Sequence, residues 1–131
     1  MSTASHLVPT VPPRYLKRIH DLLADGQRKL LGLVGPPGAG KSTLAMALQQ
    51  AFGSLSQVVP MDGYHLANVE LQRLGRADRK GAPDTFDSAG YANLLQRLRK
   101  QGDDEIVYAP EFRRDIEEPI AGAIPVLAET R

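Results

Sequence analysis

The stretch that decides how this chain is interpreted is Gly35-Pro36-Pro37-Gly38-Ala39-Gly40-Lys41-Ser42-Thr43. It fits the phosphate-binding template G-x-x-x-x-G-K-[ST], in which two fixed glycines precede a lysine and a hydroxyl side chain. Glycines allow a backbone to wrap around phosphate oxygens without clashes from β-carbons. We therefore predict that residues 35–43, called the phosphate loop below, bind the phosphates of a nucleotide.

The sequence on either side of the phosphate loop supports this prediction. Residues 30–34 (LLGLV) form an apolar run of strand length, and residues 43–52 carry leucine and phenylalanine at helical spacing. In a strand, loop and helix of this kind, the N–H groups and the dipole of the new helix attract an anion. Lys41 would then reach the β- and γ-phosphates, and the Ser42 hydroxyl would hold Mg²⁺. The alternative is a glycine-rich turn that leads into a helix, with Lys41 in solvent.

Composition narrows the class of protein. The 131 residues predict one domain over residues 1–131, of which residues 1–12 are expected to be flexible. The 16 basic and 15 acidic residues nearly balance, whereas a general nucleic-acid binder usually has a basic excess. Without cysteine there is no disulfide framework, no apolar run approaches the roughly 18 residues of a membrane span, and the start lacks a secretory pattern. We therefore expect a cytoplasmic protein that acts on a small molecule, and neither on nucleic acid nor on a membrane.

Hydrophobic patterns predict the remaining elements. A helix is expected from Pro13 until Gly26 ends it, a short helix over residues 66–74, and a third helix that opens at Asp87 or Ser88. On this last helix, a stripe of Tyr91, Leu94, Leu95 and Leu98 is expected to be core. Residues 57–61 and 105–108 are expected to be strands, and residues 124–127 are a last short apolar segment.

Asp62 directly follows the expected strand at residues 57–61. Ligands of an open α/β sheet bind beyond the carboxyl ends of its strands, so we expect Asp62 on the same rim as the phosphate loop. A carboxylate there can accept a proton from a substrate hydroxyl or bind Mg²⁺. The alternative is that Asp62 caps the next helix. Tyr64 and His65 would contact the substrate or, equally, pack locally.

A polar stretch at residues 73–87 is the next candidate, because long loops in compact domains are often functional. Arg79 and Lys80 would meet an anionic group or remain solvated. Asp84 and Asp87 would bind substrate hydroxyls or serve as turn and cap residues.

Two adjacent arginines, Arg113 and Arg114, follow the expected strand at residues 105–108. Arginines in a loop can clamp a phosphate or a carboxylate. The alternative is that they pair with the nearby acidic residues Asp115, Glu117 and Glu118.

Four pieces of the sequence, GPPGAGKST, PMDGYHL, RKGAPDTFD and YAPEFRRDIEEPI, occur in this order between residue 30 and about residue 120. Together they resemble the P-loop small-molecule kinases of the uridine kinase, pantothenate kinase and phosphoribulokinase group. The likeness is strongest to bacterial proteins of the nucleoside/nucleotide kinase or fructose transport system kinase type. The resemblance implies an α/β P-loop NTPase fold with three layers and a mainly parallel sheet.

The resemblance also implies roles for individual residues. Lys41 and Asp62 would be catalytic, with Asp62 activating the acceptor hydroxyl. ATP would bind to Gly35, Pro36, Pro37, Gly38, Ala39, Gly40, Lys41, Ser42 and Thr43, and Mg²⁺ to Ser42 and Asp62. At the acceptor, the resemblance implies Asp62, Asp84 and the region around residues 112–114. Together with the candidates named above from the residues themselves, the predicted acceptor-binding set is Asp62, Tyr64, His65, Arg79, Asp84, Arg113 and Arg114. Uridine kinases have a tyrosine–aspartate pair where this chain has Phe112-Arg113, which argues against a nucleoside bound in their manner.

Members of this group are longer than this chain, so we expect it to lack a C-terminal strand ending in Glu-Gly, an arginine-bearing lid and an adenine-side strand. Two alternatives to the kinase remain open. One is a nucleotide-binding module without turnover. The other is a nucleoside-monophosphate kinase, since GPPGAGK also occurs in adenylate kinases, although these usually follow the lysine with Gly-Thr. The sequence does not specify the oligomeric state, and a dimer stays open.

Overall fold

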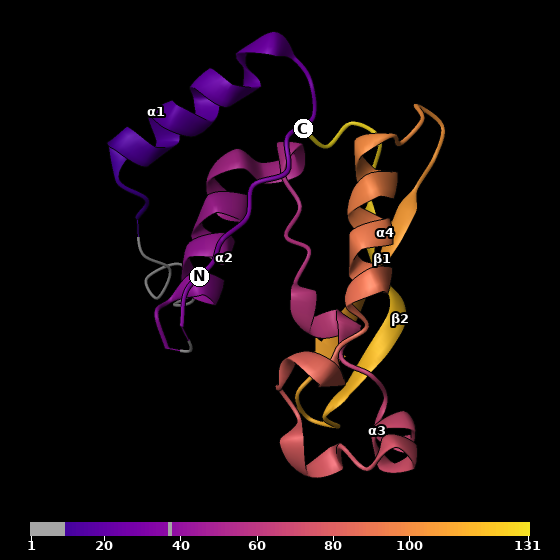
Figure 1. The fold of residues 1–131 in the computed structure, drawn as a ribbon. Coiled ribbons are helices and arrows are strands. Elements are labelled where there is room, and N and C mark those ends of the chain that lie inside the picture. Colours follow the sequence, from indigo (N-terminus) through magenta and orange to yellow (C-terminus); the bar gives the residue numbers. More distant parts are fainter. Residues whose placement is uncertain (1–9, 37) are drawn as a thin grey trace. The chain divides into compact units, whose positions relative to one another are not determined.

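The computed structural model describes residues 10–36 and 38–131 (Figure 1). Most of the segment expected to be flexible, residues 1–12, and the loop residue Pro37 lie outside the described residues. The helices are α1 (Pro13–Leu22), α2 (Lys41–Phe52), α3 (Asn68–Leu74) and α4 (Ser88–Arg99), and the strands are β1 (Val107–Arg113) and β2 (Glu118–Val126). Short 3₁₀ turns cover Leu23–Asp25, Gly53–Leu55, Met61–Tyr64, Ala77–Arg79 and Pro83–Thr85.

These elements form two compact units. The described part of the first unit runs from residue 10 to Val58 and includes Glu129–Arg131, and the second unit is Val59–Ala128. The phosphate loop belongs to the first unit, whereas Asp62 and the other acceptor-side candidates belong to the second. That the chain forms a single domain stays a prediction.

The first unit contains two helices that begin and end close to the predicted positions. Helix α1 starts at Pro13, whose fixed φ suits the first helical position, and the 3₁₀ turn after it ends before Gly26. The rings of His20 in α1 and Phe52 in α2 lie 5.1 Å apart. Helix α2 begins at Lys41, directly after the glycines of the phosphate loop.

The strands predicted at residues 30–34 and 57–61 are wrong for this structure, because neither segment is hydrogen-bonded into a sheet. An extended segment becomes a strand only when a neighbouring backbone takes up its N–H and C=O groups. Residues 30–34 have no partner strand among the described residues, and Leu31 and Val34 are 55% and 93% exposed. Residues 30–34 therefore have the apolar pattern of a strand, but the part of the chain that the structure describes supplies no strand to pair with them.

Two backbone hydrogen bonds, both made by Arg131, link the residues just before these two segments. The Lys29 N–H donates to the Arg131 carbonyl oxygen at 2.8 Å, and the Arg131 N–H donates to the Leu55 carbonyl oxygen at 2.8 Å. The Arg28 guanidinium also donates to the Thr130 carbonyl oxygen at 3.0 Å. The last residues of the sequence therefore bridge the backbone ahead of residues 30–34 and the turn ahead of residues 57–61.

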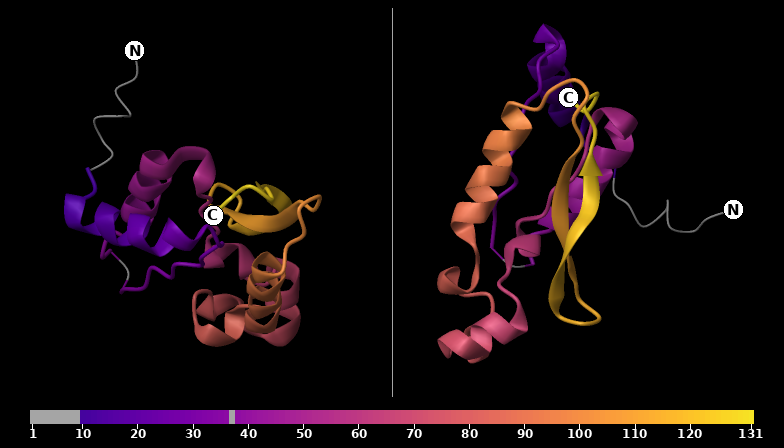
Figure 2. Two further views of the ribbon diagram at one scale, coloured as in Figure 1. Left: turned by 90° about the horizontal axis from the view of Figure 1, so that it is seen from above. Right: turned by 90° about the vertical axis from the view of Figure 1, so that its right-hand side faces the viewer.

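The second unit is built from α4 against a β-hairpin (Figure 1, Figure 2). Both views show α4 running alongside β1 and β2, and the buried residues account for this arrangement. The core cluster consists of Leu94, Leu98, Val107, Ala109 and Val126. The leucine stripe predicted on the last helix is thus confirmed as core, and the Asp87 carboxylate caps this helix by accepting from the Gly90 N–H at 3.0 Å.

The hairpin strands are antiparallel, with Val107 opposite Val126 and Arg113 opposite Glu118. The register is irregular between Ala109 and Glu111, around Pro110, which has no N–H for the ladder. Helices with a small sheet agree with the predicted α/β class. The mainly parallel sheet is not found in residues 10–36 and 38–131, whose sheet is this antiparallel pair.

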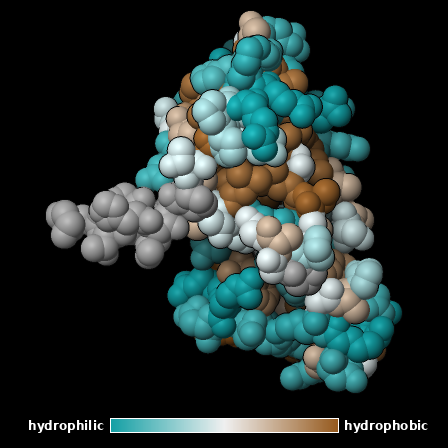
Figure 3. Space-filling view, turned by 90° about the vertical axis from the view of Figure 1, so that its left-hand side faces the viewer, coloured by the Kyte–Doolittle hydropathy of each residue, from teal (hydrophilic) through white to brown (hydrophobic). Residues whose placement is uncertain are grey.

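The surface carries apolar as well as polar areas. Figure 3 shows hydrophobic surface bordered by polar side chains on one face. Several large apolar side chains are exposed, including Met46 in α2 and Val69 in α3. Among the described residues, none of the helices is both long enough and apolar enough to span a membrane.

Candidate functional site

Two glycines of the phosphate loop adopt a left-handed backbone conformation. Gly38 and Gly40 have φ of 80° and 91°, in the left-handed region that glycine adopts without strain. A β-carbon on Gly35 would lie 3.3 Å from the Ala39 β-carbon and 3.6 Å from Lys41 Cγ, so the loop closes tightly on itself. The Ala39 N–H donates to the Pro36 carbonyl oxygen at 3.1 Å, which holds the turn.

Lys41 is the first residue of α2, and its side chain turns back over the loop. The Lys41 ammonium donates to the Gly35 carbonyl oxygen and lies 3.4 Å from the Pro36 carbonyl oxygen. No described side chain caps the N-terminus of α2, and its first turn contains no acidic residue. The helix start therefore combines uncapped N–H donors, a favourable dipole and an ammonium group, all of which attract an anion.

The two predicted Mg²⁺ ligands, Ser42 and Asp62, lie in different units, and each carries an oxygen of a kind that Mg²⁺ takes as a ligand. The Ser42 hydroxyl is exposed at the start of α2, and the Asp62 carboxylate is 48% exposed in the second unit. The described residues contain no group of three or more His, Cys, Asp or Glu side chains that could hold a metal ion. Mg²⁺ usually takes only one or two protein oxygens and fills its shell with water and phosphate oxygens. That Asp62 shares a rim with the phosphate loop remains a prediction.

Asp62 lies in the 3₁₀ turn Met61–Tyr64, and the N-cap position of the next helix is Ala67. Gly63 places this turn directly on β1. A β-carbon on Gly63 would collide with the Pro110 carbonyl group, so only glycine permits this approach. The close contact brings Asp62 beside the hairpin although the two segments are far apart in the sequence.

The two adjacent arginines have different partners. The Arg114 Nη2 atom lies 3.8 Å from Asp62 Oδ2, whereas the Arg113 guanidinium donates to the Asp115 carboxylate at 3.3 Å. Arg113 thus takes the alternative role of pairing with a neighbouring acid, and this contact holds the pKa of Asp115 below its ordinary value. Arg114 is joined instead to the proposed catalytic carboxylate.

His65 occupies the centre of an aromatic cluster. Its ring centroid lies 4.2 Å from that of Phe86 and 4.5 Å from that of Phe112. The His65 Nδ1 atom is 2.7 Å from the Asp62 carbonyl oxygen. The Lys80 ammonium lies 5.7 Å from the Phe112 ring centroid and donates to the Glu117 carbonyl oxygen at 2.7 Å. Three separate stretches of sequence therefore meet around this imidazole.

Asp84 is held by arginines. Its Oδ2 atom lies 2.9 Å from Arg79 and 3.5 Å from Arg76, and Arg76 also donates to the Asp84 carbonyl oxygen at 3.0 Å. The Asp84 Oδ1 atom is buried and has no hydrogen-bond partner among the described residues. Arg79 is therefore engaged within the chain, and Asp84 keeps one carboxylate oxygen without a described donor.

Tyr64 packs toward the core of the second unit, with its ring 5.4 Å from that of Tyr91. Burial raises the pKa of the Tyr64 hydroxyl above its ordinary value, and the Asp87 carboxylate adds to this effect. Burial likewise raises the pKa of Tyr91. Tyr64 thus takes the packing role that the sequence left open.

Within the second unit, the structure brings together Asp62, His65 and Arg114 from the predicted list. Arg79 and Asp84 form a neighbouring ion pair, Arg113 faces Asp115, and Tyr64 faces the core. Sequence reasoning did not single out Gly63, Phe86 and Arg76. Gly63 had one signal, its place directly after Asp62, and Phe86 lies within the RKGAPDTFD piece.

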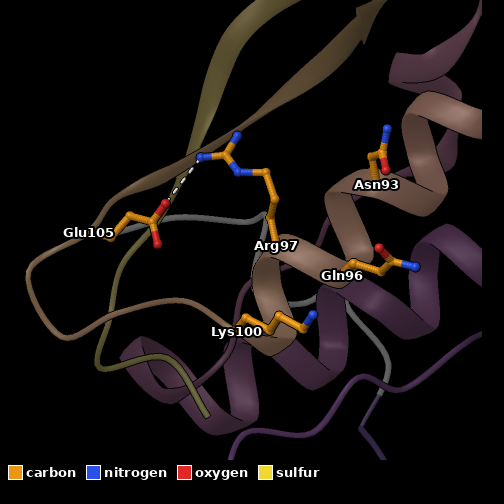
Figure 4. A pocket seen from close by; sticks show the side chains of 5 residues that line it. All are labelled: Asn93, Gln96, Arg97, Lys100 and Glu105. Carbon is orange, nitrogen blue, oxygen red and sulfur yellow. Dashed lines mark hydrogen bonds and ion pairs between the residues drawn. The ribbon is translucent and has the colours of Figure 1, made fainter.

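A separate polar pocket lies on α4 and the turn after it (Figure 4). It is lined by Asn93, Gln96, Arg97, Lys100 and Glu105. The Arg97 guanidinium lies 3.2 Å from the Glu105 carboxylate across it. None of the predicted site residues lines this pocket.

Comparison with known proteins identifies relatives, although no family model matches the chain. A uridine kinase-like protein of Schizosaccharomyces pombe is 38% identical over 123 residues, which are 87% of this chain and 52% of that protein. The pantothenate kinase of Enterococcus faecalis is 30% identical over 105 residues, which are 76% of this chain and 34% of that protein. An ATP-dependent kinase-like protein of Aspergillus versicolor is also among the relatives.

A solved structure resembles the chain in three dimensions. The crystal structure of a fructose transport system kinase from Silicibacter has a TM-score of 0.71 and 45% identity, covering 80% of this chain and 51% of that one. The chain thus spans about half the length, or less, of these proteins. They confirm the resemblance inferred from the four sequence pieces.

Proposed function

From its homology to kinases of the P-loop group, we propose that this protein transfers the γ-phosphoryl group of ATP to a hydroxyl group of a small molecule. The observation that carries the proposal is the phosphate loop, in which Lys41 turns over left-handed glycines at the uncapped start of α2. The relatives are longer than this chain, so the proposal concerns the activity of the whole protein. The three-layer P-loop NTPase fold is part of the same proposal.

On the nucleotide side, the chain supplies charge and donors. The Lys41 ammonium exchanges the carbonyl oxygens of Gly35 and Pro36 for phosphate oxygens. The N–H groups at the start of α2 point toward the same anion. When Mg²⁺ is bound, the Ser42 hydroxyl is its ligand, and the ion supplies neutralisation of phosphate charge. These groups act by positioning and electrostatics, which dominate phosphoryl transfer.

On the acceptor side, Asp62 orients the attacking hydroxyl and takes its proton. The acceptor oxygen forms a bond to the γ-phosphorus while the bond from that phosphorus to the ADP oxygen breaks. The proton of the acceptor hydroxyl moves to the Asp62 carboxylate. The exposure of this carboxylate supports the role, because an acceptor from solvent can reach it.

Binding of Mg-ATP to the 131-residue chain tests the nucleotide side. We expect Mg-ATP to raise the melting temperature, with about 2.7 kcal/mol of stabilisation at a hundredfold excess over Kd. The Lys41→Ala variant should lose this shift. Lys17→Ala is the matched control, because Lys17 pairs with Asp21 on the exposed side of α1. An equal shift in all three proteins would contradict the proposed phosphate site.

Turnover by the whole protein tests the proposed role of Asp62 at the acceptor. ATP consumption is measured with sugar, nucleoside and pantothenate-like acceptors, for the wild type and for Asp62→Asn. Product formed only with a hydroxyl acceptor, and lost in Asp62→Asn, is the expected result. Nucleotide binding without product for every acceptor would favour a nucleotide-binding module. Nucleoside monophosphates as the sole acceptors would favour a nucleoside-monophosphate kinase.

A further inference from the structure

The Asp62 carbonyl oxygen is held by His65. This oxygen accepts two hydrogen bonds from one residue, from the His65 backbone N–H at 3.1 Å and from His65 Nδ1 at 2.7 Å. A carbonyl oxygen only accepts, so Nδ1 must carry the proton. In the neutral ring, Nε2 is then the nitrogen with the free lone pair.

The imidazole is fixed by packing as well as by this hydrogen bond. The rings of Phe86 and Phe112 lie on it at centroid distances of 4.2 Å and 4.5 Å. The backbone on both sides of His65 is paired with the stretch around Phe86. The Leu66 N–H donates to the Thr85 carbonyl oxygen at 2.9 Å, and the Asp87 N–H donates to the Tyr64 carbonyl oxygen at 2.8 Å.

We propose that His65 is the positioning residue of the acceptor site: its Nδ1–H, locked between Phe86 and Phe112, fixes the Asp62–Gly63 peptide and thereby aims the Asp62 carboxylate. This inference rests on the proposed role of Asp62 as the residue that activates the acceptor. Gly63 rests on the Pro110 carbonyl group and the half-exposed Asp62 carboxylate pairs with Arg114, whereas the hydrogen bonds from His65 hold the Asp62 carbonyl oxygen itself. Small misplacements of a catalytic group can reduce a rate by about 100-fold.

Two substitutions separate the hydrogen bond from the packing. His65→Phe keeps an aromatic ring between Phe86 and Phe112 but removes the donor. His65→Asn places an amide N–H near the position of Nδ1 but removes the ring. His20→Phe is the matched control, because His20 also packs against a phenylalanine, Phe52, but lies in the first unit.

The first readout is spectroscopic and needs no activity. Long-range ¹H–¹⁵N spectra of the full chain should show the His65 ring as the Nδ1–H tautomer. Backbone relaxation at Asp62 and Gly63 should show increased motion in His65→Phe and recovery in His65→Asn, with His20→Phe like the wild type. An Nε2–H tautomer, or unchanged relaxation in His65→Phe, would overturn the inference.

The second readout compares the change in kcat with the change in the KM for ATP. In His65→Phe we expect kcat to fall about 10- to 100-fold, with the KM for ATP within about twofold of the wild type. His65→Asn should recover part of kcat, and His20→Phe should leave it unchanged. If the wild type turns over and kcat is unchanged in His65→Phe, the inference about His65 is overturned, but the proposed function is not. If the whole protein, without substitutions, shows no turnover with any acceptor, the proposed function is overturned, while the relaxation result still decides whether His65 positions Asp62.

Discussion

The Arg114 guanidinium lies 3.8 Å from the Asp62 carboxylate, from Nη2 to Oδ2, and so links the hairpin end to the turn that carries the proposed acceptor-activating residue. The Arg114 side chain is 81% exposed and that of Asp62 is 48% exposed. Exposed ion pairs contribute only about 0–1 kcal/mol to stability. We therefore expect this ion pair to orient the Asp62 carboxylate and to contribute little to the free energy of unfolding.

Arg114→Gln should lower kcat by roughly tenfold while the free energy of unfolding changes by less than about 0.5 kcal/mol. The substitution removes the cation beside Asp62 but keeps a side chain of similar length. Arg113→Gln is the control, because the neighbouring arginine pairs with Asp115. Steady-state kinetics and urea unfolding of both variants measure the effects. Equal losses of kcat in the two variants would argue against a specific role of the Arg114–Asp62 contact.

Gly63→Ala should destabilise the protein by about 1–3 kcal/mol, because the new β-carbon would collide with the Pro110 carbonyl group. Gly102→Ala is the control, because a β-carbon on Gly102 meets no atom within 4 Å. Urea unfolding followed by circular dichroism gives both values. A Gly63→Ala protein as stable as Gly102→Ala would show that the turn and β1 separate easily.

Glu118→Ala should destabilise the protein by about 1 kcal/mol. The Glu118 carboxylate, on β2, accepts a hydrogen bond at 2.6 Å from the N–H of Asn68, the first residue of α3, and the substitution removes this bond. Glu118→Gln keeps an acceptor oxygen and should lose less than half as much. Chemical unfolding compares the two. Equal losses would mean that packing of the side chain, and not the hydrogen bond, holds the helix start.

Alkaline pH should weaken the second unit through Tyr64 and Tyr91, whose pKa values are raised by burial above the ordinary 10.0. The folded state favours the protonated hydroxyls. Their contribution to stability is therefore complete below about pH 10 and is lost as the pH rises through the folded-state values. Unfolding free energies at pH 8 and pH 10.5 measure the loss.

Tyr64→Phe and Tyr91→Phe should each reduce this alkaline loss, since phenylalanine has no proton to release. Tyr108→Phe is the control, because the Tyr108 side chain is exposed. An alkaline loss that is the same in the wild type and in the Tyr64→Phe, Tyr91→Phe double variant would contradict the assignment.

The sequence alone determined the features that depend on neighbouring residues. The glycines and Lys41 of the phosphate loop, the start of α1 at Pro13 and the cap of α4 at Asp87 follow from local conformational preferences and local hydrogen bonds. The leucine stripe of α4 follows from helical periodicity. These predictions need no knowledge of distant segments, because each depends on residues within one or two turns.

The tertiary structure decided what depends on partners from elsewhere in the chain. Residues 30–34 have the apolar pattern of a strand but pair with no strand among residues 10–36 and 38–131, because a strand needs a second backbone that the pattern cannot specify. The same holds for the site, because its contacts join segments that are distant in the sequence: Phe86 and Phe112 pack against His65, Arg114 reaches Asp62, and Gly63 rests on Pro110. Sequence chemistry named most of these residues, but only folding assigned Arg114 to Asp62 and Arg113 to Asp115. Two adjacent arginines have the same chemistry, and the backbone at the end of β1 and in the turn after it sets what each one reaches.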